Sequence, residues 1–143
     1  MRKLIIYLFV LFLGSQVALA QAAGDVLGEW LTDEGKARIE IYKENGKYNG
    51  KIVWLKEPNN PDGSPKLDVE NPDDDLQKRP IMGLNLIEGF TFDDDEWVDG
   101  EIYDPESGKT YDCKMELNGN ELEVRGYIGI SMFGRTVTWT RVK

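Results

Sequence analysis

The side chains of this sequence that could do chemistry are mainly carboxylates, and three consecutive aspartates occupy positions 73–75 in the stretch "NPDDDLQKRP". Calcium binds clusters of carboxylate oxygens, so a cation site is one interpretation. A short helix explains the same residues without a metal. Asn71 is a good N-cap, Pro72 suits the first helical position, and Pro80 ends the segment. The aspartates would then lie at the positive end of the helix dipole.

A second acidic series resembles a calcium-binding EF-hand loop. Asp95, Asp99 and Glu106 stand at its first, fifth and twelfth places, with Gly100 at the sixth. However, the third place holds Trp97, which has no oxygen ligand to offer, and the flanking residues alternate as strands do. We therefore expect no metal site here either.

Two scarce residue types exclude most other site chemistry. The sequence has no histidine, which excludes Ser-His-Asp and Cys-His nucleophile systems and most zinc sites. Its one cysteine, Cys113, cannot form an internal disulfide and alternates with apolar residues, which predicts a buried thiol. Carboxylates remain as possible acid–base groups, but their spacing singles out no pair. Nothing in the sequence points to a cofactor.

The first twenty residues have the pattern of a signal peptide. A basic start at Arg2 and Lys3 precedes an apolar run at 4–13 and the small-residue site Ala18-Leu19-Ala20. That run is too short for a transmembrane segment. We expect residues 1–20 to be removed and residues 21–143 to form a single domain, periplasmic or secreted. Without Arg2 and Lys3, 15 basic residues face 26 acidic ones, a net charge of −11. This charge disfavours nucleic acid and repels anionic lipid head groups.

The mature chain reads as short alternating segments separated by turn signals, which predicts an all-β protein. Asn45-Gly46 is a typical hairpin turn between two such segments. Eight strands are expected at 26–31, 37–41, 48–55, 81–92, 97–104, 110–117, 121–127 and 135–142. An antiparallel up-and-down meander of eight strands can close into a barrel without free edges. The long connection at 56–79 contains four prolines and would carry the short helix.

The two ends of the predicted barrel carry a pair that fits its closure. Gly28 and Trp30 lie on the first strand, and Arg141 lies on the last. If those strands are neighbours, the guanidinium of Arg141 can stack on the indole of Trp30 and plug the narrow end, with Gly28 passing beneath the ring. This arrangement resembles the Gly-x-Trp and terminal Arg of the lipocalin and calycin barrels.

Longer stretches carry a second resemblance. The segments "NPDDDLQKRPIMGLNLI", "WVDGEIYDPESGKTYDCKMEL" and "LEVRGYIGISMFGRTVTWTRV" are similar to the domain-of-unknown-function family 2147 (DUF2147), which comprises small exported bacterial proteins. The resemblance implies a lipocalin-like barrel and supplies no catalytic residues. Asp99 departs from the family pattern, in which glycine is common at that place.

The barrel interior is predicted to be apolar, which fits either a filled core or a ligand pocket. Strand phase places these residues inward: Ile39, Ile41, Ile52, Trp54, Val98, Ile102, Cys113, Met115, Val124, Val137 and Trp139. Basic and aromatic residues near the mouth could bind the head group of a fatty-acid-like ligand. The candidate ligand-binding residues are Trp54, Arg79, Tyr103, Arg125, Tyr127 and Phe133. Alternatively, Arg79 and Arg125 pair with Asp104 or Glu123 and tie the long loop to the barrel.

Three functions remain open. The favoured one is a non-catalytic carrier or sensor of a small apolar or amphiphilic molecule. The second is a module that binds another envelope protein, with the long proline-rich loop as its support. The third is an enzyme based on a carboxylate pair. An open apolar cavity would favour the carrier, an exposed apolar rim over a filled core would favour the module, and two buried carboxylates in one cleft would favour the enzyme.

Overall fold

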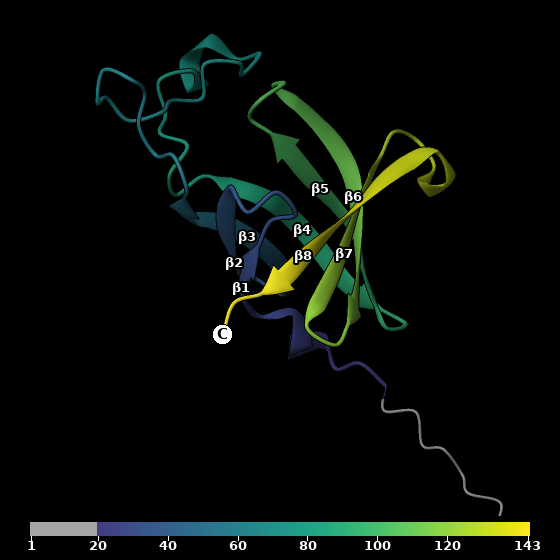
Figure 1. Ribbon diagram of the computed structural model, residues 1–143. Coiled ribbons are helices and arrows are strands. Elements are labelled where there is room, and N and C mark those ends of the chain that lie inside the picture. The colour runs from purple at the N-terminus through teal and green to yellow at the C-terminus, as the bar shows by residue number, and fades with distance from the viewer. Residues whose placement is uncertain (1–19) are drawn as a thin grey trace, which may run out of the picture.

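Residues 20–143, which the computed structural model describes, form a closed barrel of eight antiparallel strands in sequential order (Figure 1). The strands are β1 (Gly28–Leu31), β2 (Ala37–Glu44), β3 (Lys47–Leu55), β4 (Asn85–Asp93), β5 (Glu96–Asp104), β6 (Lys109–Asn118), β7 (Glu121–Tyr127) and β8 (Gly134–Arg141). The predicted all-β, up-and-down barrel of eight strands is confirmed.

The barrel closes through pairing of its first and last strands. β1 pairs antiparallel with β8, with Trp30 opposite Arg141 and Leu31 opposite Thr140. Every strand therefore has two neighbours, so no long edge is left to pair with other chains.

The connections alternate between the two ends of the barrel. Tight turns after β2, β4 and β6 lie at the end where η1 (Ala23–Val26) and the C-terminus also lie (Figure 1). The long loop, residues 56–84, and the β7–β8 connection lie at the opposite end, which we call the mouth. At the closed end, Asn45 and Gly46 both have positive φ, 51° and 76°, as a two-residue hairpin turn requires.

The core fills the closed half of the barrel. Its largest fully buried side chains are Trp30, Trp97, Trp139 and Phe90. The indole N–H of Trp97 donates to the carbonyl oxygen of Ala23 at 3.1 Å, so the η1 segment closes this end. Gly100 makes room for Phe90, because a Cβ at position 100 would lie 2.4 Å from the phenyl ring.

Two residues predicted to face inward do not, because β-bulges shift the strand phase. Arg38 pairs with Trp54 while Ile39 pairs with Ile52, so one extra residue of β3 separates these pairs. Trp54 consequently faces out, with the Arg38 guanidinium 5.0 Å from its ring. A second bulge follows Trp97 in β5 and turns Trp97, rather than Val98, into the core.

At this second bulge, Asp99 adopts φ 59°, a left-handed conformation that glycine adopts without strain. This conformation gives a physical reason why glycine is common at this position in the family pattern that the sequence resembles.

The short helix in the long loop is smaller than predicted and is capped by another residue. It is one 3-10 turn, η2 (Asp74–Leu76), and the side chain of Asp73 accepts from the Asp75 N–H at 3.0 Å. Asn71 does not cap it, because its side-chain oxygen accepts from the Asp73 N–H and its amide nitrogen donates to Asp68. The remaining regular elements are η1 and a 3-10 turn before β8, η3 (Ser131–Phe133).

The predicted signal peptide, apart from its last residue, lies outside the described residues. Across residues 20–143, none of the helices has the length and hydrophobicity needed to cross a membrane.

Candidate ligand-binding site

A large open cavity enters the barrel from the mouth. Its volume is about 1440 Å³, and strands and mouth loops together line it. Most of the strand residues that line it are apolar, among them Ile52, Ile102, Val124, Val137 and Trp139, while Asp104 and Arg135 line it at the strand ends nearest the mouth. The long loop adds Leu67, Val69 and Ile81 near the opening. The interior can therefore take an apolar group of ligand size without a rearrangement of the packed half.

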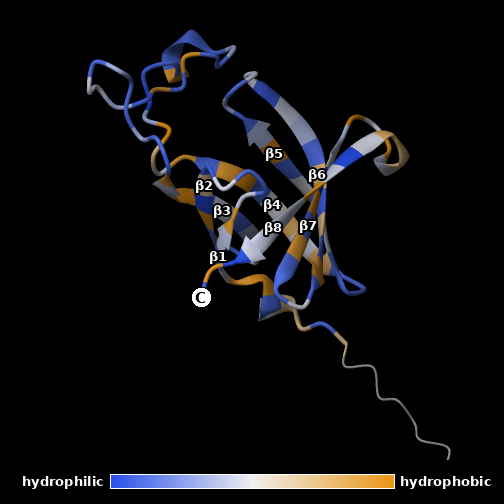
Figure 2. Ribbon diagram, viewed as in Figure 1, coloured by the Kyte–Doolittle hydropathy of each residue, from blue (hydrophilic) through white to orange (hydrophobic). Residues whose placement is uncertain are grey.

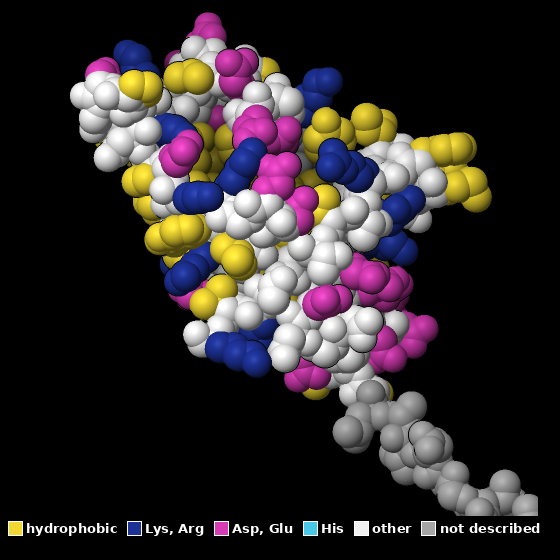
Figure 3. Space-filling model, in the orientation of Figure 1, with side chains coloured by type: hydrophobic (Ala, Val, Ile, Leu, Met, Phe, Trp, Pro, Cys, Tyr) yellow, Lys and Arg dark blue, Asp and Glu magenta, His cyan; other side chains and the backbone are white. Residues whose placement is uncertain are grey.

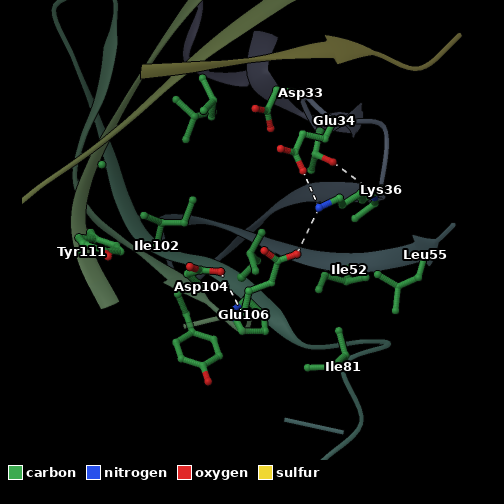
Figure 4. A pocket seen from close by; sticks show the side chains of 18 of the residues that line it. Asp33, Glu34, Lys36, Ile52, Leu55, Ile81, Ile102, Asp104, Glu106 and Tyr111 are labelled. Carbon is green, nitrogen blue, oxygen red and sulfur yellow. Dashed lines mark hydrogen bonds and ion pairs between the residues drawn. The ribbon is translucent and has the colours of Figure 1, made fainter. Parts of the chain in front are cut away.

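A bridge of three charged side chains crosses one side of the mouth. Lys36, before β2, has its Nζ 2.6 Å from Glu34 Oε2 and 3.4 Å from Glu106 Oε1, in the β5–β6 turn (Figure 4). The ion pair with Glu34 raises the pKa of Lys36, and Lys36 in turn lowers the pKa of Glu34. We call these three residues the rim bridge. It joins two loops that are 70 residues apart in the sequence.

The rest of the rim mixes both signs of charge. Its further charged residues are Asp33, Lys56, Glu57, Lys66, Asp104 and Arg135. An apolar interior under a charged rim suits an amphiphilic molecule, whose tail would be buried while its head stays at the water interface.

A buried carboxylate fixes the long loop that shapes the mouth. The side chain of Asp68 is fully buried and accepts from Tyr103 Oη at 2.6 Å, Arg79 Nε at 2.8 Å and Asn71 Nδ2 at 2.9 Å. Burial by itself raises the pKa of Asp68, but these three donors outweigh it, and the net pKa is lowered. Asp68 therefore remains ionised and ties the loop to β5.

A close backbone contact adds a second attachment of the long loop. Gly108, in the β5–β6 turn, has φ 72°, and a Cβ there would lie 1.9 Å from the carbonyl oxygen of Glu70. Only glycine lets these two mouth loops approach so closely.

Three of the six predicted ligand-binding residues line the cavity: Tyr103, Tyr127 and Phe133. The other three lie elsewhere. Trp54 is on the outer face, Arg79 is bound to Asp68, and Arg125 is bound to the β7–β8 connection. A third arginine, Arg135 at the start of β8, does line the cavity.

Arg79 ties the loop down, but not through the expected partners. It pairs with Asp68 rather than Asp104 or Glu123. Arg125 donates to the carbonyl oxygen of Ser131 at 2.6 Å and to Thr136 Oγ1 at 2.8 Å. Sequence analysis did not predict the rim bridge or the role of Asp68, because the residues around each charge do not indicate which distant charge it will contact across the mouth.

The plug residues meet at the closed end. The Arg141 guanidinium lies 4.2 Å from the Trp30 ring centroid and donates to the carbonyl oxygens of Leu27 at 3.0 Å and Asp25 at 2.6 Å. Gly28 has φ 120°, and a Cβ there would lie 3.3 Å from Arg141 Nη1. The closed end is thus sealed by packing and by hydrogen bonds, which leaves the mouth as the way in.

The cysteine and the carboxylates of the EF-hand-like series do not form a reactive or metal-binding site in the described residues. Cys113 is fully buried in the core, as its alternation with apolar residues predicts, and burial raises the pKa of its thiol to about 12. Asp95 and Glu106, of the EF-hand-like series, are separated by the length of β5. Within residues 20–143, no group of three or more carboxylate or cysteine side chains is arranged to hold a metal ion.

The comparison with protein families matches residues 28–141, from the start of β1 to the end of β8, to DUF2147, described as an uncharacterized protein conserved in bacteria. The chain belongs to the DUF2147 family. A similar solved structure is protein HP1028 from Helicobacter pylori, which belongs to the lipocalin family. It has 27% sequence identity and a TM-score of 0.73, over 83% of this chain and 84% of that one. No curated protein matches.

Proposed function

We propose that this DUF2147 chain is an exported carrier or sensor that binds one small amphiphilic molecule in its barrel. The observation that carries the proposal is the open cavity of about 1440 Å³, with an apolar wall and a charged rim. An eight-stranded barrel can either fill its interior with side chains or hold one small ligand. Here the closed half is filled and the mouth half is open. The lipocalin-like fold supports the same function.

Export is part of the proposal and rests on the signal-peptide pattern of residues 1–20. The non-catalytic character rests on the chemistry of the interior. Among residues 20–143, Asp68 is the one buried carboxylate, and three donors hold it outside the cavity wall. The charged side chains of the cavity lie at its rim, and the strand residues deeper inside are mainly aliphatic and aromatic.

Two measurements test the proposal. Native mass spectrometry of gently purified protein should show a retained molecule of lipid-like mass. After delipidation, the protein should bind 1-N-phenylnaphthylamine, an apolar fluorescent probe, with one site per chain, and long-chain fatty acid should displace it. A chain that retains nothing and leaves the probe fluorescence unchanged would show that the cavity does not bind apolar molecules.

A further inference from the structure

The connection between β7 and β8 exposes a cluster of large apolar side chains. Ile128, Ile130, Met132 and Phe133 are 75%, 56%, 75% and 73% exposed, and we call them the apolar tip. Figure 2 shows this connection projecting from the barrel with hydrophobic residues at its end. Single exposed apolar residues are ordinary, but a contiguous group on one projection marks a surface that contacts something apolar.

The fold holds this tip in place. Arg125 donates to the carbonyl oxygens of Ser131 and Met132 and to Thr136 Oγ1. The N–H of Phe133 donates to the carbonyl oxygen of Ile130 at 3.2 Å. Because the backbone finds these partners within the hairpin, the apolar side chains can point to solvent without unfolding the connection.

The tip is also part of the cavity entrance. Ile128 and Phe133 line the cavity, whereas Ile130 and Met132 lie outside it. Any surface that covers the tip must therefore face the mouth directly.

The charge beside the tip differs in sign from that of the molecule. Arg125 and Arg135 flank the connection in a chain whose net charge is −9. Figure 3 shows Lys and Arg side chains next to the projecting hydrophobic group, with Asp and Glu side chains gathered farther along the same face. Charges are screened over about 8–10 Å at physiological ionic strength, so the arginines beside the tip act on what it contacts more strongly than the carboxylates of the closed end do. The net charge alone predicted repulsion from anionic lipid, but it averages over this asymmetry.

We propose that the apolar tip docks the barrel on a lipid bilayer, with the cavity mouth facing the membrane. Four apolar side chains on a narrow hairpin can enter the interfacial region, and flanking arginines can contact anionic head groups. A protein partner would need a broad complementary face of about 800 Å² per side, which a single projecting hairpin does not offer. The acidic turn at 93–95 lies at the closed end and is repelled by the same membrane, so the closed end should face away from it.

Membrane docking is a separate property from ligand binding, and each can be tested without the other. If both hold, an amphiphile could pass between the bilayer and the cavity without its tail crossing open water.

Vesicle flotation tests the docking. The protein is mixed with vesicles of phosphatidylethanolamine and phosphatidylglycerol, and the floating fraction is measured for the parent and for the double variant Ile130→Ser/Met132→Ser. Both side chains are exposed and lie outside the cavity lining, so folding and probe binding should stay as in the parent. We expect the partition coefficient of the variant to fall at least about tenfold.

The matched control is Leu76→Ser/Met82→Ser, which removes two exposed apolar side chains, 37% and 42% exposed, from the long loop. It should float like the parent. The docking proposal is overturned if the parent does not float, or if the tip variant floats as well as the parent. It is also overturned if the parent is a dimer that the tip variant dissociates and neither floats, since a second copy would then cover the tip. Flotation without probe binding would support docking and contradict the carrier function.

Discussion

The guanidinium of Arg141 lies 4.2 Å from the ring centroid of Trp30, its register partner across the β8–β1 seam. The same guanidinium donates to two carbonyl oxygens of the segment before β1. One cation–π contact and two charge-assisted hydrogen bonds therefore fasten the two ends of the chain where the barrel closes.

Loss of either partner should destabilise the whole barrel. Trp30→Ala leaves a cavity in the core, and Arg141→Ala leaves two carbonyl groups without their donor, so each should lower the free energy of unfolding by about 2 to 4 kcal/mol. Chemical denaturation measures the loss. The double variant should lose less than the sum of the two, because the pair shares one contact. Variants that unfold at the parent's denaturant midpoint would contradict the role of this pair.

The closure of the barrel could be predicted from the sequence, and the plug residues show why. Gly28, Trp30 and Arg141 lie at the chain's ends, and closure of a meander brings those ends together whatever the loops do. The prediction of which strand residues face inward was less accurate. It failed at Trp54 and Val98, because a period of two carries no mark of the extra residue in a bulge.

The mouth was harder still to predict. Asp68 and Tyr103 are 35 residues apart, and Lys36 and Glu106 are 70 apart. Only the paths of the mouth loops decide which of many acidic side chains each donor meets. The hydrophobic residues of the cavity wall were predictable, but whether they would fill the barrel or leave it open depends on side-chain volumes across neighbouring strands.

The attachment of the long loop should depend on pH through Asp68. Tyr103→Phe removes the 2.6 Å hydrogen bond and should lower the free energy of unfolding by about 1 to 2 kcal/mol near neutral pH. The pKa of Asp68 is lowered in the fold, so its contribution is present above its unfolded value of about 3.9 and is lost as the pH falls through the folded pKa. Denaturation at a series of pH values should show the difference between parent and variant shrinking below about pH 4.

Tyr111→Phe serves as the control for loss of a phenolic hydroxyl, because the donors to the Asp68 carboxylate are Asn71, Arg79 and Tyr103 and do not include Tyr111. A pH-independent difference for Tyr103→Phe would show that the hydroxyl acts on something other than the Asp68 carboxylate.

The rim bridge should affect the rate of ligand entry more than stability. The side chains of Lys36, Glu34 and Glu106 are all more than half exposed, so Lys36→Met should change the melting temperature by no more than about 2 °C. Its removal frees two mouth loops from each other, and probe association followed by stopped flow should become faster. Added salt should increase the rate of probe association for the parent and leave the rate for the variant unchanged, because ions screen the rim bridge.

Lys47→Met makes the same change of charge at the first residue of β3, at the closed end, and should leave the rate of probe entry unchanged. Equal rates for all three proteins would show that the bridge does not restrict the mouth.

Narrowing the cavity from its wall should reduce ligand binding without unfolding the barrel. A Cβ at Gly126 would point inward and lie 3.5 Å from Ile102 Cγ2 and 3.6 Å from Tyr111 Cβ, which is ordinary contact. Gly126→Phe should therefore place a phenyl ring among the cavity residues and weaken probe binding by at least about tenfold, while the melting temperature stays near that of the parent. Thr138→Phe adds the same ring to the outer face of β8 and should bind like the parent. If Gly126→Phe is folded and binds the probe as tightly as Thr138→Phe, the ligand does not occupy the barrel.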